Sequence, residues 1–319
     1  MPRRFTFVGV TTGSSSIMRI FPRWRDVLGL GDDVEMLPCD LPIGAPRERY
    51  RDTVAMLRDD PDNLGALVTT HKIDLYEAAH DLFDELDANA RTYGEVSCVF
   101  KRDGALHGAA KDPITAGRAL EDVLPARHWA GGDAEALVLG AGGAGVAIVL
   151  HLLRPSAAAE RPARITVVDR DGGRLDALRR LQEAQHPGAD VLYADAADGA
   201  ADRLLAALPA GSLVVNATGM GKDRPGSPLT DDAVFPERGI VWELNYRGEL
   251  DFLRQARAQE QARGLTVHDG WRYFIFGWTS VIEEVFAVPI DAATIDRLAD
   301  AADFARPAPV GAASPDRGA

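Results

Sequence analysis

Short apolar runs alternate with polar and amphipathic stretches through the first third of the chain. The runs at residues 5–10, 34–38 and 65–69 have the length and composition of β-strands, and residues 47–58 have the periodicity of a helix. A turn rich in hydroxyl groups, at residues 11–16, precedes a further predicted helix. This succession of strands and helices predicts a mainly parallel sheet.

A second succession of strands and helices begins near residue 136. The apolar run 136–139 is followed by the glycine-rich segment 140–145 and then by an apolar helix that continues to residue 153. Further apolar strands are predicted at 164–168 and 212–216. Three parallel strands with intervening helices form half of a doubly wound sheet.

Two segments are expected to lie outside these elements. Residues 154–163 contain two prolines and four alanines, a composition that predicts a loop insertion. Residues 306–319 are rich in Pro, Ala and Gly and predict a disordered tail. With 319 residues the chain is long enough for two domains, and we place the first boundary near residue 115.

Composition argues against several classes of partner. Apolar residues form 46% of the chain and charged residues 26%, as in ordinary globular proteins. The net charge of -13 and the lack of a basic stripe argue against nucleic acid and membranes. No sequence segment is long and apolar enough to span a bilayer, and the first residues lack the features of a signal peptide. We expect a cytoplasmic monomer or homodimer that binds a small molecule.

Cysteine and histidine positions indicate no metal site and no disulfide. The two cysteines, Cys39 and Cys98, lie in different motifs, which fits a reducing compartment. The seven histidines are scattered without the spacing of metal ligands. We therefore predict chemistry that uses no bound metal.

The glycine-rich segment has the spacing of a dinucleotide-binding fingerprint. Gly140 permits a tight turn, Gly142 lets the backbone approach a pyrophosphate, and Gly145 allows close packing of the helix. The amides of Gly143 and Ala144, together with the helix dipole, would meet the phosphates. The alternative is a glycine-rich turn without a ligand, but its place between a predicted strand and a predicted helix favours the binding site.

The residue that ends the next strand affects the choice of dinucleotide. Asp169 can accept hydrogen bonds from the ribose hydroxyls and would repel a 2′-phosphate, which favours NAD. Arg170 could instead hold that phosphate, although Asp171 opposes this, so NADP stays possible. The turn after the third strand is expected beside the nicotinamide ribose, with contacts from Asn216, Thr218 and Met220.

Transfer of a hydride from a secondary alcohol needs a group that exchanges the hydroxyl proton. Lys72 is a candidate because it follows a strand and a short turn, from which its ammonium could point into a cleft. Burial would lower the pKa of this lysine, whereas a nearby carboxylate such as Asp112 would raise it. From the residues alone, two other interpretations stay open: Lys72 as a surface lysine and Asp112 as a helix N-cap.

Eight landmarks in chain order resemble shikimate dehydrogenase and its quinate-using relatives. They lie at residues 14–16, 66–72, 94–98, 108–112, 140–145, 216–220, 243–246 and from 270 onward. The resemblance implies that Lys72 and Asp112 are catalytic and that Ser14 and Ser16 hold a substrate carboxylate. Further substrate contacts are expected from Thr69, Ser97 and Tyr246.

The resemblance also implies an α/β fold, with a doubly wound Rossmann domain and a smaller α/β substrate-binding domain. We predict the substrate-binding and catalytic domain at residues 1–115 and the NAD(P)-binding domain at 116–267. C-terminal helices at 268–305 are expected to return to the first domain.

Several positions depart from the pattern of the family. Where the family has asparagine, proline, two further polar pairs and a glutamine, this chain has Ala66, Thr70, Ser97 with Cys98, Ala110 with Lys111, and Gly277. A site built for hydroxyl groups loses affinity when its hydrogen-bonding partners are missing. These changes therefore predict a substrate other than shikimate, and the resemblance supports the reaction more firmly than the substrate.

Some side chains near the expected cleft have two interpretations. Lys111 would bind an anionic substrate group or face solvent, His71 would reach the cleft or be structural, and Tyr246 would approach the ligands or pack at the domain junction. The aromatic residues between 271 and 278 would line a pocket or, at their helical spacing, form core.

We therefore predict an NAD(P)-dependent oxidoreductase that interconverts an alcohol and a ketone on a hydroxylated ring acid similar to shikimate or quinate. One alternative keeps the fold and acts on an amino- or deoxy-cyclohexane carboxylate or a cyclitol. Another is a ligand sensor without turnover.

Overall fold

The computed structural model describes residues 2–130, 132–154, 161–222 and 224–307. Most of the predicted loop insertion and the predicted tail from position 308 lie outside these residues. The chain forms two compact units, one from Met1–Thr115 with Ile275–Arg306 and the other chiefly from Ala116–Phe274.

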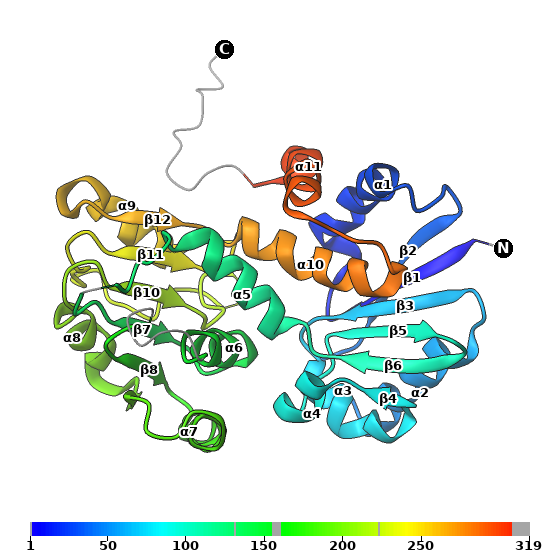
Figure 1. The fold of residues 1–319 in the computed structure, drawn as a ribbon, viewed down its shortest axis with the longest axis horizontal. Coiled ribbons are helices and arrows are strands. Elements are labelled where there is room, and N and C mark those ends of the chain that lie inside the picture. The colour runs from blue at the N-terminus through cyan, green and yellow to red at the C-terminus, as the bar shows by residue number, and fades with distance from the viewer. Residues whose placement is uncertain (1, 131, 155–160, 223, 308–319) are drawn as a thin grey trace, which may run out of the picture. The chain divides into compact units, whose positions relative to one another are not determined.

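A six-stranded mixed sheet organises the first unit (Figure 1). Its strands lie in the order β2-β1-β3-β5-β6-β4. Their bounds are β1 (Arg3–Gly9), β2 (Val34–Asp40), β3 (Asn63–Val68), β4 (Glu85–Leu86), β5 (Cys98–Arg102) and β6 (Ala105–Ala109). Strand β1 pairs in parallel with both β2 and β3.

Strands β5 and β6 form an antiparallel hairpin, and β5 is also antiparallel to β3. The hairpin turn contains Asp103 and Gly104, both with positive φ, at 53° and 82°. An Asp-Gly pair favours the tight turn of a two-residue hairpin because both central residues of that turn need positive φ. The expectation of a mainly parallel sheet therefore holds for β1, β2 and β3, and this turn is the signal for the antiparallel part.

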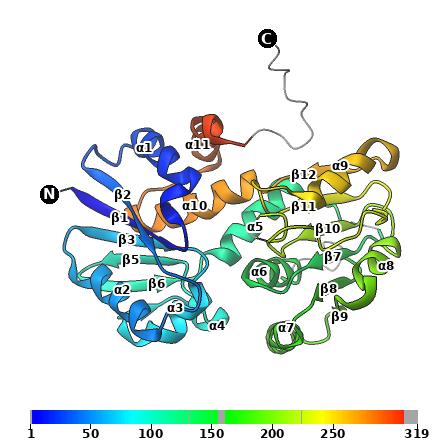
Figure 2. The same ribbon diagram turned by 180° about the vertical axis from the view of Figure 1, so that it is seen from behind.

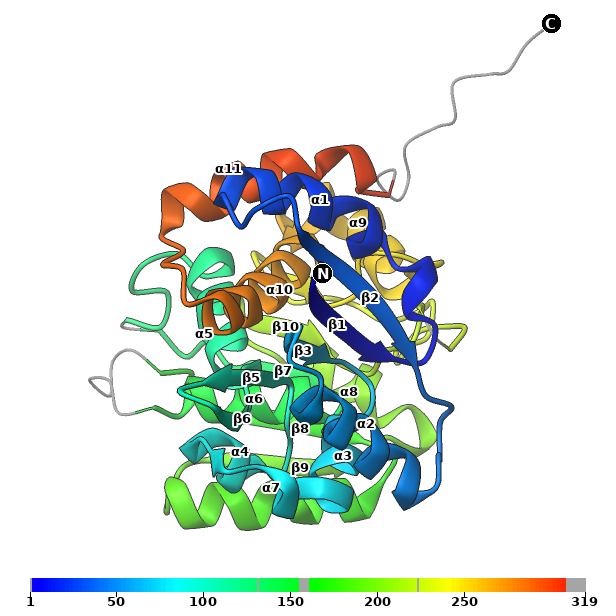
Figure 3. The same ribbon diagram turned by 90° about the vertical axis from the view of Figure 1, so that its right-hand side faces the viewer.

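Helices cover both faces of this sheet. They are α1 (Ser16–Leu28), α2 (Arg47–Asp59), α3 (Lys72–Ala79), α4 (Ala88–Tyr93), α11 (Ala292–Ala302) and most of α10 (Trp271–Phe286). Helix α11 packs along α1, as Figure 3 shows. The indole Nε1 of Trp24, which is fully buried, donates a hydrogen bond of 2.7 Å to the Leu298 carbonyl. This bond fixes the C-terminal helix to the N-terminal helix of the same unit.

The second unit is built on a six-stranded parallel sheet. Figure 2 shows its strands in the order β12-β11-β10-β7-β8-β9. Their bounds are β7 (Ala136–Leu139), β8 (Ile165–Asp169), β9 (Val191–Asp195), β10 (Leu213–Asn216), β11 (Ile240–Glu243) and β12 (Thr266–His268). The helices are α5 (Asp112–Val123), which begins in the first unit, α6 (Gly143–Leu152), α7 (Gly172–Gln185), α8 (Ala200–Ala206) and α9 (Asp251–Arg263).

The strand order of this unit is that of a doubly wound dinucleotide-binding fold. Every residue of β7, β10 and β11 is buried, as expected for strands of a parallel sheet covered on both faces. The order reverses between β7 and β10, and ligands of such folds bind outside the carboxyl ends of the strands at this point. The predicted α/β fold with a Rossmann sheet is confirmed. In the described part of the chain, no helix combines the length and apolar character needed to cross a membrane.

Candidate active site

Lys72 and Asp112 form an ion pair in the first unit. The Lys72 Nζ donates to both carboxylate oxygens of Asp112, at 2.6 Å and 2.5 Å. Lys72 begins α3 after the loop that follows β3, and Asp112 begins α5 shortly after β6. The two side chains are 25% and 12% exposed, so the pair is partly shielded but not closed off. Two residues separated by forty positions in the sequence thus share one site.

The surroundings of the pair keep Lys72 protonated. Burial alone would lower the pKa of Lys72, but the carboxylates of Asp112 and Glu95 outweigh it, and the net pKa lies above the usual value for lysine. A protonated amine in this position can donate a proton to an oxygen that gains negative charge. The carboxylate of Asp112 orients the amine from the other side.

Ser97 supports the pair through the backbone. Its hydroxyl accepts a hydrogen bond of 2.7 Å from the backbone N–H of Lys111, directly before Asp112. The backbone N–H of Ser97 donates to the Ala109 carbonyl at 3.0 Å. The side chain is almost fully buried, and its hydroxyl thus helps to hold the start of α5.

The other predicted substrate contacts of the first unit follow β1 and β3. Thr69 is half-buried, and its hydroxyl donates to the Val8 carbonyl at 3.3 Å. Ser14 is exposed with its hydroxyl on the Thr11 carbonyl, and Ser16 is the half-buried first residue of α1. Both serines thus lie at the turn that leads from β1 into α1.

This serine turn is held by a residue that the sequence analysis did not select. Asp40, at the end of β2, accepts hydrogen bonds from the backbone N–H and the hydroxyl of Thr12, at 2.7 Å and 2.5 Å. Because Ser14 and Ser16 lie two and four positions after Thr12, Asp40 fixes the start of the segment that carries them. The Thr-Gly-Ser sequence gave no indication of a partner so far along the chain.

Two side chains with open interpretations have structural roles. His71 is buried, with Nε2 at 2.9 Å from the Leu41 carbonyl and Nδ1 at 3.2 Å from the Tyr50 hydroxyl. Lys111 is also buried and donates to the Glu284 carboxylate at 2.6 Å. The interpretation of Lys111 as a solvent-facing side chain is therefore wrong, and its charge is already paired within the unit.

The glycine-rich turn of the second unit connects β7 to α6. Gly140 has φ +108°, and an added Cβ there would lie 2.7 Å from the backbone of Ala217. A Cβ on Gly145 would lie 2.0 Å from the Gly140 carbonyl, whereas one on Gly142 would meet nothing within 4 Å. The first two residues of α6 are Gly143 and Ala144, whose N–H groups have no acceptor within the helix. The turn thus leaves open space and free donors at a helix N-terminus.

Asp169 binds this turn from the end of β8. One carboxylate oxygen accepts from the Ala141 N–H at 2.7 Å and the other from the Asp171 N–H at 2.9 Å. Asp171 in turn caps α7 by accepting from the N–H groups of Gly173 and Arg174. Arg170 is exposed beside these carboxylates. The sequence analysis gave Asp169 a role toward ribose and did not foresee its hold on the turn.

A buried polar network shapes the turn after β10. The Asn216 amide donates to the Glu243 carboxylate at 2.6 Å and accepts from the hydroxyl of Thr218 at 2.7 Å. The Thr218 hydroxyl in turn accepts from the Met220 N–H at 3.1 Å. Asn245 closes the network, because its side chain donates both to Glu243 and to the Met220 carbonyl.

Glu243 is the centre of this network and was not among the predicted site residues. Burial raises its pKa to about 7, and the hydrogen bonds from Asn216 and Asn245 limit that rise. Its place at the end of a buried strand, next to a second strand end that carries an amide, is the signal that could have found it.

Tyr246 lies among aromatic side chains of the second unit. Its ring centroid is 5.3 Å from that of Trp271 and 4.6 Å from that of Phe274. In the first unit, Trp278 of the same aromatic segment packs against Phe7 at 4.8 Å. The aromatic residues from 271 onward therefore contribute to packing, as their helical spacing indicated.

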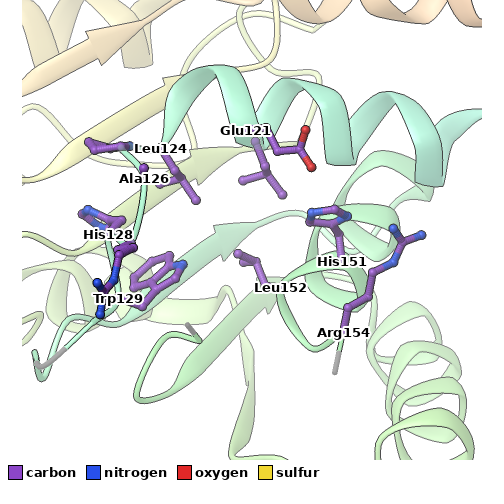
Figure 4. A pocket seen from close by; sticks show the side chains of 11 residues that line it. Glu121, Leu124, Ala126, His128, Trp129, His151, Leu152 and Arg154 are labelled. Carbon is purple, nitrogen blue, oxygen red and sulfur yellow. The ribbon is translucent and has the colours of Figure 1, made fainter. Parts of the chain in front are cut away.

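A separate cavity of about 630 Å³ lies beside α5 and the end of α6 (Figure 4). Its lining includes His128 and Trp129 from the segment after α5 and His151 from α6. Burial lowers the pKa of His151 to about 4, and the charge of Arg154 contributes to this. The residues that line this cavity do not include any of the predicted site residues.

The sequence of the chain is similar to those of known shikimate dehydrogenases. No family model matches it. Shikimate dehydrogenase (NADP(+)) of Symbiobacterium thermophilum is 32% identical over 222 residues, which cover 66% of this chain and 71% of that protein. The protein of the same name from Methylobacterium radiotolerans is 33% identical over 272 residues, covering 84% and 86%. The chain belongs to the shikimate dehydrogenase family.

The fold agrees with this assignment. The quinate dehydrogenase from Corynebacterium glutamicum in complex with NAD has a TM-score of 0.71 with this chain at 21% identity, covering 94% of this chain and 98% of that one. At that identity the likeness shows the fold alone. Shikimate dehydrogenases are NAD(P)-dependent oxidoreductases that act on CH–OH donors, and as a member of the family the chain is an oxidoreductase of this class.

Proposed function

We propose that the chain interconverts a secondary alcohol and a ketone on a hydroxylated ring acid similar to shikimate or quinate, with Lys72 and Asp112 as the acid/base pair. The observation that carries the proposal is the two-oxygen contact between Lys72 and Asp112, at 2.6 Å and 2.5 Å. Membership of the shikimate dehydrogenase family supports the reaction class.

In the proposed mechanism, Lys72 exchanges the proton of the substrate hydroxyl group. A nicotinamide dinucleotide, when bound, would supply or accept the hydride. In ketone reduction the Lys72 ammonium donates its proton to the carbonyl oxygen, and in alcohol oxidation the neutral amine takes the hydroxyl proton. Asp112 orients the amine and stabilises its charged form.

The second unit would hold the dinucleotide. The free N–H groups of Gly143 and Ala144 and the open space at Gly142 fit a pyrophosphate. Asp169 favours NAD, because its carboxylate would repel a 2′-phosphate, while Arg170 leaves NADP possible. The turn that carries Asn216, Thr218 and Met220 would lie beside the nicotinamide ribose. The two curated relatives are named as NADP(+) enzymes, and the quinate dehydrogenase was solved with NAD.

The substrate is proposed to carry an anionic group that Ser14 and Ser16 hold. The family's amides are missing at Ala66 and Ala110, and the Ser97 hydroxyl already accepts a backbone bond. These changes favour a substrate with fewer or different ring hydroxyls than shikimate. Amino- or deoxy-cyclohexane carboxylates and cyclitols are therefore the second candidate class, and Thr69 and Tyr246 stay proposed contacts.

An absorbance assay at the reduced-nicotinamide band tests the proposal. NAD and NADP are offered separately with shikimate, quinate, amino- and deoxy-cyclohexane carboxylates and cyclitols. Turnover of at least one ring compound is expected. Tight binding of ring compounds without any nicotinamide turnover would support a ligand sensor instead.

A further inference from the structure

Glu95 is a buried carboxylic acid next to the proposed acid/base pair. Only 4% of the residue is exposed. It follows Gly94, which ends α4 with φ +63°. Burial of a carboxyl group lowers the stability of the folded protein unless charges or hydrogen bonds compensate it. We therefore ask what Glu95 does at this site.

Backbone contacts tie the segment that carries Glu95 to both members of the pair. The N–H of Val96, the next residue, donates to the Lys72 carbonyl at 3.0 Å. Ser97, one residue further, is bound to Ala109 and Lys111 on the strand and turn that lead to Asp112. The segment that carries Glu95 is thus anchored on one side to Lys72 and on the other to the residues before Asp112.

Three charged groups from separate elements act on Glu95. Lys72 comes from α3, Asp112 from α5, and Asp87 from the N-cap of α4. Burial raises the pKa of Glu95 to about 8, the Asp112 and Asp87 carboxylates add to this rise, and Lys72 opposes it. In the reverse direction, the Glu95 carboxylate raises the pKa of Lys72. This coupling is reciprocal, because two interacting sites change each other's proton affinity equally.

We propose that Glu95 is a positioning residue of the acid/base site: as a carboxylate it holds Lys72 in the ammonium form, and as a neutral acid it releases that hold. The inference rests on the proposed role of Lys72. Glu95 would therefore favour proton donation to a ketone at alkaline pH and oppose the formation of the neutral amine that alcohol oxidation needs.

The first test needs no turnover. The chain has four lysines, so a protein labelled with ¹³C-lysine gives few side-chain signals, and a Lys72→Arg variant assigns the relevant one. In the wild type, the Lys72 signal should show a titration step near the pKa of Glu95, about 8. The step should vanish in Glu95→Gln and persist in Glu135→Gln, which removes a carboxyl group in the second unit.

The second test is the pH profile of alcohol oxidation. In Glu95→Gln the pH at which kcat reaches half its plateau should fall by about one unit with KM nearly unchanged, since one favourable charge interaction with Lys72 is lost. Should Glu95→Gln fold poorly, Glu95→Ala takes its place. An unchanged Lys72 titration and an unchanged profile would overturn the inference about Glu95. Full turnover by Lys72→Ala would instead overturn the proposed function.

Discussion

The carboxylate of Asp169 accepts a hydrogen bond of 2.7 Å from the backbone N–H of Ala141, so the end of β8 holds the glycine-rich turn after β7. The same side chain is the proposed discriminator between NAD and NADP. It therefore combines a structural role with a proposed role in cofactor choice, and two substitutions can separate these roles.

Asp169→Asn keeps an oxygen for the Ala141 N–H but removes the charge. We expect it to raise the affinity for NADP relative to NAD roughly tenfold, because about 1.4 kcal/mol of charge repulsion is removed. Asp169→Ala should shift the ratio similarly and also weaken both dinucleotides, because the turn loses its acceptor. Fluorescence titration with each reduced cofactor measures both effects. Equal ratios in all three proteins would refute the role of the charge.

Gly142 and Gly145 give a matched pair of alanine substitutions. Gly142→Ala should fold like the wild type, since its Cβ meets nothing within 4 Å, but it should bind the dinucleotide weakly because the Cβ occupies the space proposed for the pyrophosphate. Gly145→Ala should lower the melting temperature, because its Cβ would lie 2.0 Å from the Gly140 carbonyl. Calorimetry with and without cofactor distinguishes them. Undiminished cofactor binding by Gly142→Ala would exclude this turn as the phosphate site.

His151 should make stability depend on acidity. Its pKa is lowered from 6.5 to about 4 in the folded protein, mainly by burial. Between these values the unfolded chain binds more protons than the folded one, so stability should fall as the pH falls through this window. His151→Leu should reduce that dependence, whereas substitution of the exposed His80 by Gln should not. Thermal unfolding across the window provides the measurement, and parallel curves for the wild type and His151→Leu would contradict the assignment.

Local patterns predicted the parts of the fold that depend on neighbours in sequence. The strand at 136–139 and the glycine-rich turn were predicted because buried strands and tight turns have strong local signals. The β5–β6 hairpin was missed although Asp103 and Gly104 carry its turn signal. The Lys111 contact with Glu284 joins residues far apart in sequence, and no spacing rule indicates such a pair.

In the candidate site, too, the sequence indicated some residues, whereas the roles of others depend on contacts between distant parts of the chain. The order of the landmarks suggested that Lys72 and Asp112 belong together, and their distance is now known. Glu95 and Glu243 lie within the landmarks but were not selected as site residues, because an acidic residue is ordinarily exposed and only the tertiary structure shows that these two are buried. Ser97 was chosen as a substrate contact, but its bond to the Lys111 backbone could not be inferred from the sequence.

The central claim is that Lys72 transfers the proton, and Lys72→Ala tests it most directly. The measurement compares turnover of the best ring substrate, followed by nicotinamide absorbance, with dinucleotide affinity in the same variant. We predict a loss of turnover of at least about 10²-fold with nearly unchanged dinucleotide affinity, because a general acid or base contributes on that order. Lys101→Ala, which removes a lysine bound to the Asp60 carbonyl elsewhere in the first unit, should stay active. Wild-type turnover by Lys72→Ala would contradict the account.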